Sequence, residues 1–251
     1  MRRIGSSSAF TLIELLSVIA IIAVLASILS VGLGSARSKA DRIFCSSQLR
    51  QHALAAEMYR QDNKGLFFPY QESVPSRDSG SLMVRYWFGA VGRGAEGERS
   101  YDRKSSFLNP YLDSSKISIC PAFPYGRDFV KLKFSGLSSG YGYNIHLSKD
   151  RWNAREVRYI RRPSTTVVFT DAAQINTFQF PATAANPLLE EFYMVAGNQQ
   201  TVHFRHGETT VSVMVDGHVE NLTAERDGVS LRSLRGQVVG SLQSRMLANE
   251  Y

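Results

Sequence analysis

Residues 10–33 have the sequence FTLIELLSVIAIIAVLASILSVGL, in which nearly every position is apolar or small. A helix of roughly 20 such residues crosses the hydrocarbon core of a bilayer, so this stretch is long enough to span a membrane. Glu14 breaks the pattern. An ionised carboxylate within a span costs about 2.5 kcal/mol or more, so an acid in this place is a functional hypothesis by default.

Two simpler interpretations of residues 10–33 compete with a functional span. The first is a secretory signal peptide that is cut after Gly34-Ser35-Ala36, but the apolar core of such a signal has only about 7–15 residues and lacks a carboxylate. The second is a plain single-pass anchor in which the carboxylate of Glu14 extends toward the membrane interface. Neither alternative explains both the stretch Phe10-Thr11-Leu12-Ile13-Glu14 and the absence of charge from the rest of the run.

The stretch Ala9-Phe10-Thr11-Leu12-Ile13-Glu14 resembles the prepilin-type signal of type IV pilins and type II secretion pseudopilins. The resemblance implies that a prepilin peptidase cuts between Ala9 and Phe10, that the new amine of Phe10 is methylated, and that Glu14 acts in assembly. Ala9 stands where the family usually has Gly. Arg2 and Arg3 precede the span and place the N-terminus in the cytoplasm by the positive-inside rule.

Glu14 needs a positive partner if it lies in lipid, because an unpaired charge in a medium of low dielectric constant is strongly penalised. The amine of Phe10 on a neighbouring subunit would be such a partner. The ion pair would then fix the axial register between subunits.

The composition predicts one anchor and one globular domain of ordinary size. The chain has 251 residues, of which 43% are hydrophobic and 20% charged, with a formal net charge of +7. Such a composition is typical of a folded protein. The basic residues are scattered along the chain, so no specific nucleic-acid partner is expected.

The predicted organisation has four parts: a leader at 1–9, a transmembrane and assembly helix at 10–33, its periplasmic continuation at 34–64, and a globular domain at 65–251. We expect the helix to end near Lys64-Gly65, because Gly favours a helix stop. At 100° per residue, the second half of the helix has a wide apolar stripe formed by Cys45, Leu49, Ala53, Ala56 and Tyr59. A narrow apolar stripe on nearly the opposite side is formed by Ile43, Leu54 and Met58.

The pilin architecture implied by the resemblance gives each stripe a partner. The wide stripe would pack on the chain's own globular domain, and Ile43, Leu54 and Met58 would meet neighbouring helices in a fibre. The alternative is that these three side chains are unrelated surface exposures.

Cys45 and Cys120 are the two cysteines of the chain. The predicted orientation places both outside the cytoplasm, where disulfides persist. A bond between them would close a loop of about 76 residues and stabilise the fold by roughly 4 kcal/mol on the chain-entropy model. Two separate buried thiols are the alternative.

The C-terminal third predicts an antiparallel meander, which together with the long helix makes an α+β fold. The predicted strands are rich in β-branched residues, and Asp216-Gly217 is a tight-turn signal; they span Thr165–Asp171, Val202–Arg205, Thr210–Val215 and His218–Leu222. A closing amphipathic helix is expected from the helical spacing of Leu231, Leu234, Val238, Leu242 and Met246.

His206 is followed by nine residues and then by Asp216-Gly217, a spacing that resembles prepilin-type proteins with a His-x9-Asp-Gly motif. Further matches to that group are Cys45, Cys120-Pro121, Tyr141-Gly142-Tyr143-Asn144 and Asp171. The usual second Gly after the motif histidine is replaced by Glu208.

Physically, a hairpin between His206 and Asp216 would let the Asp carboxylate accept a hydrogen bond from the imidazole or from turn amides. This favours a structural motif. A metal site built from His203, His206, His218, Asp171 and Asp216 is the alternative, but no spacing matches a zinc or calcium loop. We therefore predict no metal and no cofactor.

The function implied is that of a non-enzymatic structural subunit of a type IV pilus-like or type II secretion pseudopilus filament. Its partners would be other copies or related subunits, a prepilin peptidase and an inner-membrane assembly platform. The chain would sit in the inner membrane with its globular domain in the periplasm, or form a filament there or at the cell surface. The alternatives are a membrane-anchored periplasmic binding protein that does not polymerise, and an enzyme, for which the sequence has no nucleophile elbow or HExxH motif.

Overall fold

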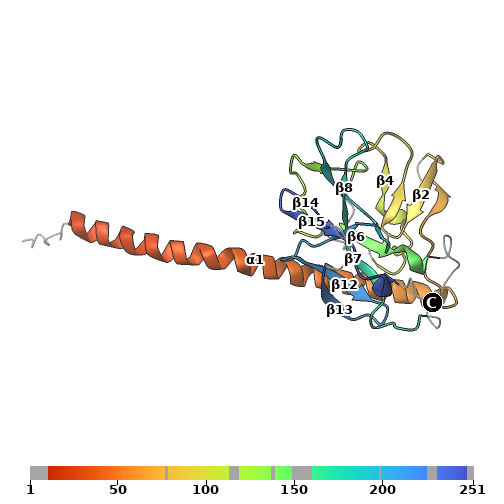
Figure 1. The fold of residues 1–251 in the computed structure, drawn as a ribbon, viewed down its shortest axis with the longest axis horizontal. Coiled ribbons are helices and arrows are strands. Elements are labelled where there is room, and N and C mark those ends of the chain that lie inside the picture. The colour runs from red at the N-terminus through yellow and green to blue at the C-terminus, as the bar shows by residue number, and fades with distance from the viewer. Residues whose placement is uncertain are drawn as a thin grey trace, which may run out of the picture. The chain divides into compact units, whose positions relative to one another are not determined.

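The protein is described here by a computed structural model that covers residues 11–76, 79–112, 119–136, 139–148, 160–197, 199–224 and 231–247 (Figure 1). The chain divides into two compact units, Met1–Ala40 and Asp41–Tyr251. A long N-terminal helix, α1, spans Leu12–Asp62 and is followed mainly by short strands. The predicted α+β fold is confirmed.

Helix α1 ends where the sequence predicts. Lys64 and Gly65 have φ angles of 57° and 82°, which turn the chain into the left-handed region. The amide of Gly65 then donates to the carbonyl of Arg60 at 2.8 Å, which satisfies one of the carbonyls left open at the helix end.

Among the residues that the structure describes, the strands form four sheets. The central sheet has the order β10-β6-β7-β12-β13, in which β10 and β6 are parallel and the other pairs antiparallel; its strands span Met194–Val195, Tyr141–Asn144, Val167–Asp171, Thr209–Met214 and Val219–Thr223. A second, antiparallel sheet has the order β1-β2-β3-β4 and spans Glu72–Pro75, Leu82–Tyr86, Gly89–Val91 and Tyr101–Asp102.

The other two sheets have three strands each. One is antiparallel, with the order β11-β15-β14, and its strands are Val202–His203, Gln237–Gly240 and Arg232–Leu234. The other has the order β5-β9-β8, with β5 parallel to β9, and its strands are Val130–Lys131, Leu188–Glu191 and Ala173–Asn176. Short 3-10 helices within the described ranges lie at Arg103–Ser105, Ile145–Leu147 and Ser244–Leu247.

The main core lies between the second half of α1 and the central sheet. Cys45 and Leu49 from the helix are fully buried in one cluster with Phe169 of β7 and Val211 and Val213 of β12. The residues between these positions point to the opposite face of the sheet and are buried too. Among them is Thr170, whose hydroxyl lies 2.6 Å from that of Ser212. Both faces of the central strands are therefore buried, which explains why β7 is buried at every position.

The predicted closing helix is wrong. Residues 232–240 form a hairpin of β14 and β15 instead, with Leu234 paired to Gln237. Arg235 and Gly236 between them have φ angles of 48° and 82°, the conformation that a two-residue hairpin turn requires. The Arg-Gly turn signal and the β-branched pair at 238–239 outweigh the helical spacing of the leucines.

The predicted meander is correct in part. β7, β12 and β13 are antiparallel neighbours, but β11 joins β15 in another sheet and does not pair with β12. Both edges of β12 are already occupied by β7 and β13, so no hydrogen-bonding edge remains for β11.

Candidate functional site

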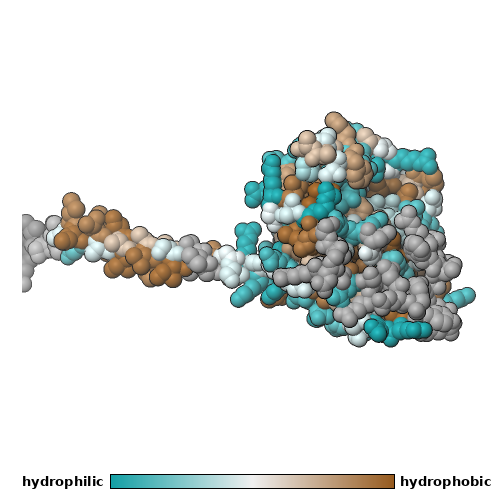
Figure 2. Space-filling model, in the orientation of Figure 1, coloured by the Kyte–Doolittle hydropathy of each residue, from teal (hydrophilic) through white to brown (hydrophobic). Residues whose placement is uncertain are grey.

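The N-terminal part of α1 is an exposed apolar surface that carries one acid. Its large hydrophobic side chains up to Ile28 range from 47% exposed at Val18 to 82% exposed at Leu12 (Figure 2). By length and composition alone, α1 can cross a membrane. A helix that is apolar on all sides is stable in lipid, because its backbone groups are paired internally.

Glu14 caps the start of this helix. Its Oε2 accepts from the backbone amide of Thr11 at 2.8 Å and from the Thr11 hydroxyl at 2.7 Å. The amide of Glu14 donates in return to the Thr11 hydroxyl at 3.3 Å. This reciprocal arrangement is a capping box. Sequence reasoning misses this cap, although Thr-x-x-Glu ahead of an apolar run is its signature.

The cap leaves the charge of Glu14 without an opposite charge. From Thr11 onward, the part of the chain that the structure describes has no cation paired with this carboxylate. Ala9 and Phe10, where cleavage and methylation are predicted, lie outside the described residues.

The second half of α1 has the two faces that the sequence predicts. Cys45, Leu49 and Ala56 of the wide stripe are buried against the globular domain. The side chains of the narrow stripe are exposed, at 69% for Ile43, 63% for Leu54 and 43% for Met58.

His52 is a core residue of this helix that sequence reasoning misses. It is fully buried and packs edge-on against Trp87, Tyr141 and Phe169, with ring centroids 5.4–5.9 Å apart. Burial lowers the pKa of His52 to about 4, although the Gln48 carbonyl, 2.7 Å from Nδ1, acts in the opposite direction. His52 is therefore neutral near pH 7.

A buried charge cluster lies at the edge of the same core. Asp171, the last residue of β7, is fully buried, and its Oδ1 lies 3.0 Å from Nη2 of Arg205. Its Oδ2 accepts from the amide of Val211 at 2.8 Å and lies 3.5 Å from Nε2 of His206. Arg205 also donates to the carbonyl of Gly140. Asp171 thus ties β7 to the start of β12 and to the turn that precedes it.

Electrostatics keep this cluster charged. Burial raises the pKa of Asp171, but Arg205, His206 and the Val211 amide outweigh it and lower the pKa below its ordinary value. Burial likewise lowers the pKa of His206, but hydrogen bonds to Asp171 and Cys120 reverse the direction and raise it to about 9. The opposite charges of Asp171 and Arg205 stabilise each other, because a buried charge without a partner is costly.

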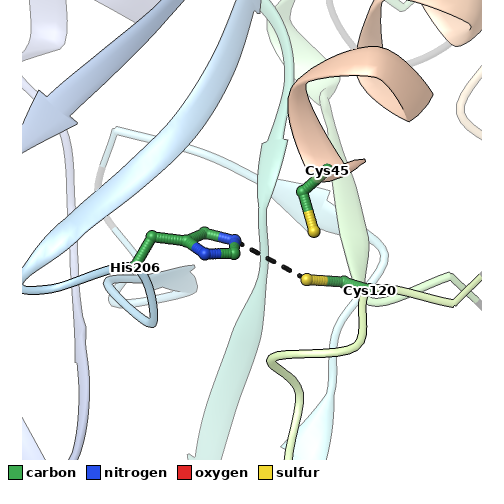
Figure 3. Close-up of side chains that lie close together, drawn as sticks. All are labelled: Cys45, Cys120 and His206. Atoms are coloured by element: carbon green, nitrogen blue, oxygen red, sulfur yellow. Dashed lines mark hydrogen bonds between the residues drawn. The ribbon is translucent and has the colours of Figure 1, made fainter. Parts of the chain in front are cut away.

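Cys45, Cys120 and His206 converge beside this pair (Figure 3). Cys45 comes from α1, Cys120 from the loop before β5, and His206 from the turn before β12. All three are buried, and Cys120 Sγ lies 3.6 Å from His206 Nε2. The structure thus brings the two cysteines together as two thiols, and the disulfide between them stays a prediction.

His206 and Asp216 of the His-x9-Asp-Gly motif do not meet. They flank β12 at its two ends, which are roughly 17 Å apart at about 3.4 Å per residue. Asp216 accepts from the amide of His218 at 3.2 Å and lies 2.7 Å from Nδ1 of the same residue, in the turn that contains Gly217 with φ of 88°. His206 pairs with Asp171 instead.

The alternative metal site suggested by the sequence is not assembled either. His218 and Asp216 lie in an exposed turn, whereas Nε2 of His203 is 3.1 Å from Gln237 in the β11–β15 sheet. Only His206 of that set lies in the cluster of possible ligands found among the described residues, and its neighbours there are the two cysteines.

Glu208 shows how the turn after His206 tolerates the missing second glycine. Gly207 and Glu208 have φ angles of 69° and 60°, and the amide of His206 donates to the carbonyl of Thr209 at 3.1 Å. This is a two-residue turn with both central residues in the left-handed region, a conformation in which Gly is preferred and Glu is strained.

Comparison with known proteins finds one relationship, and it concerns the N-terminal helix. Residues 5–30 match the prokaryotic N-terminal methylation motif. This motif is typical of type IV pilin-like proteins. Neither the curated proteins nor the solved structures contain a match to the chain. The motif and the apolar helix together describe a membrane-anchored protein that is processed like a type IV pilin or pseudopilin.

Proposed function

We propose that this chain is a structural subunit of a type IV pilus-like or type II secretion pseudopilus filament. A prepilin peptidase would cut it between Ala9 and Phe10, and an inner-membrane assembly platform would then pull it into the filament through α1. The observation that carries the proposal is a lone acid, Glu14, on an exposed apolar helix that matches the methylation motif.

Glu14 supports assembly because the described residues, from Thr11 onward, offer its carboxylate hydrogen-bond donors but no opposite charge. Thr11 supplies two donors to Oε2, but neither donor carries a charge. In lipid, a carboxylate that stays ionised needs a cation beside it. The amine of Phe10 that cleavage would release on a neighbouring copy supplies this cation. The capping box holds the carboxylate in one place before the neighbour arrives.

The narrow stripe supports a second contact farther along the helix. Ile43, Leu54 and Met58 expose apolar surface although they lie in the helix half that packs on the globular domain. In a filament these side chains would pack on neighbouring helices. The filament would consist of copies of this chain or of related subunits.

The proposal places the chain in the inner membrane. Arg2 and Arg3 lie before the apolar run, so the N-terminus stays in the cytoplasm and the domain from residue 65 onward lies in the periplasm. The proposal assigns the chain a structural role and no catalytic residue.

The decisive experiment replaces Glu14 by Gln. Gln keeps an oxygen that accepts the Thr11 donors, because capping boxes accept either Glu or Gln, so the change removes the charge and retains the cap. Sheared filaments, membrane fraction and N-terminal processing are then measured in cells. We expect Glu14→Gln to be processed and to stay in the membrane, but to be absent from filaments.

Ser17→Ala is the matched control, because Ser17 lies one turn along the same span and its hydroxyl donates at 2.9 Å to the carbonyl of Glu14 in its own helix. This variant should assemble normally. Filaments formed equally well by Glu14→Gln would overturn the proposal and favour an anchored binding protein that does not polymerise.

A further inference from the structure

The three side chains drawn in Figure 3 form a donor set that neither the methylation motif nor the proposed filament requires. Two sulfur atoms, of Cys45 and Cys120, and one imidazole nitrogen, of His206, all lie within 4.8 Å of one another. Each side chain comes from a different part of the chain, and each is buried. We propose that, in its reduced state, this cluster binds one zinc ion.

The geometry of the cluster fits tetrahedral zinc. Zn–S and Zn–N bonds of about 2.3 Å and about 2.05 Å at the tetrahedral angle place sulfur and nitrogen about 3.6 Å apart. The distance from Cys120 Sγ to His206 Nε2 is 3.6 Å. Two thiolates would be about 3.8 Å apart in the same geometry, within the 4.8 Å that separates the ligand atoms at most.

The charges around the cluster select a divalent ion. Two thiolates and the Asp171 carboxylate carry three negative charges, and the Arg205 guanidinium beside Asp171 carries one positive charge. With His206 neutral, the sum is −2, which a divalent ion balances in a buried place where an uncompensated charge is costly. A monovalent soft ion such as Cu⁺ would leave one negative charge. Zn²⁺ binding displaces to the solvent every proton that the two thiols and the ligating nitrogen of His206 carry beforehand.

All three donors are buried from solvent, and the cluster leaves the fourth position of tetrahedral zinc to a ligand from outside these three side chains. Asp171 lies beside the cluster, with Oδ2 3.5 Å from the same His206 nitrogen, and adds a negative charge next to the position of the ion. The ion would join α1 at Cys45 to the loop at Cys120 and to the turn at His206. Its consequence is a more stable globular domain.

A disulfide between Cys45 and Cys120 would consume both sulfur ligands. The disulfide and the zinc site are therefore exclusive states of the same two residues, and the proposal applies to the reduced protein. The zinc proposal does not depend on filament assembly, so the zinc proposal and the filament proposal can each fail without the other.

The test uses the full-length chain in detergent, reduced, freed of metal with a chelator, and titrated with Co²⁺ as a spectroscopic probe. We expect one cobalt ion per chain, a sulfur-to-cobalt charge-transfer band in the near ultraviolet, and the intense visible bands of tetrahedral cobalt. Zn²⁺ should displace the cobalt, remove these bands and raise the thermal midpoint of unfolding.

Cys45→Ala and His206→Gln each remove one ligand and should lose the spectrum and the zinc-dependent rise in midpoint. Near-ultraviolet circular dichroism checks that each variant is folded, and two independent variants keep the test valid if one is not. His218→Gln is the control, because His218 lies in an exposed turn away from the cluster, and it should bind cobalt normally.

Three outcomes would overturn the proposal. The first is a folded and reduced wild-type chain that binds no cobalt, and the second is a charge-transfer band that persists in Cys45→Ala. The third is a Cys45–Cys120 disulfide, found by peptide mapping, that reductant cannot open while the chain stays folded.

Discussion

Asp171→Asn tests whether the buried charge cluster stabilises the globular domain. The substitution is nearly isosteric, and the Asn side-chain oxygen can still accept the Val211 amide that now donates at 2.8 Å. What the variant loses is the negative charge 3.0 Å from Arg205, whose side chain is 1% exposed. The guanidinium is then left buried with the Gly140 carbonyl as its remaining acceptor in this cluster.

The expected magnitude follows from this geometry. Removing one partner of a buried ion pair costs about 3–5 kcal/mol, and the retained bond to Val211 favours the lower end of that range. With a urea m-value of about 2 kcal/mol/M, a loss of about 3–4 kcal/mol lowers the unfolding midpoint by roughly 1.5–2 M. The assay is urea unfolding of the full-length chain in detergent, followed by near-ultraviolet circular dichroism of the aromatic core.

Asp216→Asn is the matched control. Asp216 also pairs with a histidine, but both side chains are about two-fifths exposed, at 39% and 44%. Exposed pairs contribute about 0–1 kcal/mol, so this variant should shift the midpoint only slightly. Adding Arg205→Met to Asp171→Asn should restore part of the loss, because it removes the unpaired charge. Two results would refute this role of Asp171. One is an equal loss of unfolding free energy in Asp171→Asn and Asp216→Asn. The other is a double variant whose loss equals the sum of the losses of Asp171→Asn and Arg205→Met.

Two further predictions concern α1. Burial holds the pKa of His52 at about 4, below about 6.5 in the unfolded chain, so the unfolded state binds the proton first as the pH falls. The contribution of His52 to stability is therefore lost as the pH falls from 6.5 to 4, and the loss approaches about 3 kcal/mol. His52→Phe should remove this loss when urea midpoints at pH 7 and pH 4.5 are compared. The same pH dependence in His52→Phe as in the wild type would contradict this role of His52. Leu54→Gln should reduce filament yield while the free energy of unfolding changes by less than about 0.5 kcal/mol, because Leu54 is 63% exposed. Normal filament yield would reject the narrow stripe as a contact.

The length of the helix and the positions of its apolar surfaces could be predicted because the signals for them are local. The apolar run, the Gly65 stop and the buried stripe that includes Cys45 and Leu49 depend on spacing along one element. The sequence does not predict the burial of His52, because histidine is a polar residue that is often found at the surface. Its burial depends on the aromatic rings that the sheet brings around it.

The buried charge cluster of Asp171, Arg205 and His206 could be predicted only in part because it depends on pairing between distant strands. The His-x9-Asp-Gly spacing draws attention to His206 and Asp216, but β12 separates them. Asp171 becomes the partner of His206 because β7 and β12 are antiparallel neighbours, with Thr170 opposite Ser212. Arg205 joins them from the turn, and no spacing in the sequence indicates that contact.

The central claim is that the chain is processed like a type IV pilin, by cleavage before Phe10 and methylation of the new amine. Mass spectrometry of the N-terminal peptide of the protein isolated from its own cells tests this most directly. The account predicts a peptide that begins at Phe10 and carries a methyl group on its amine. A chain that keeps its first nine residues, or one that begins at Arg37 after cleavage of a secretory signal, would contradict it.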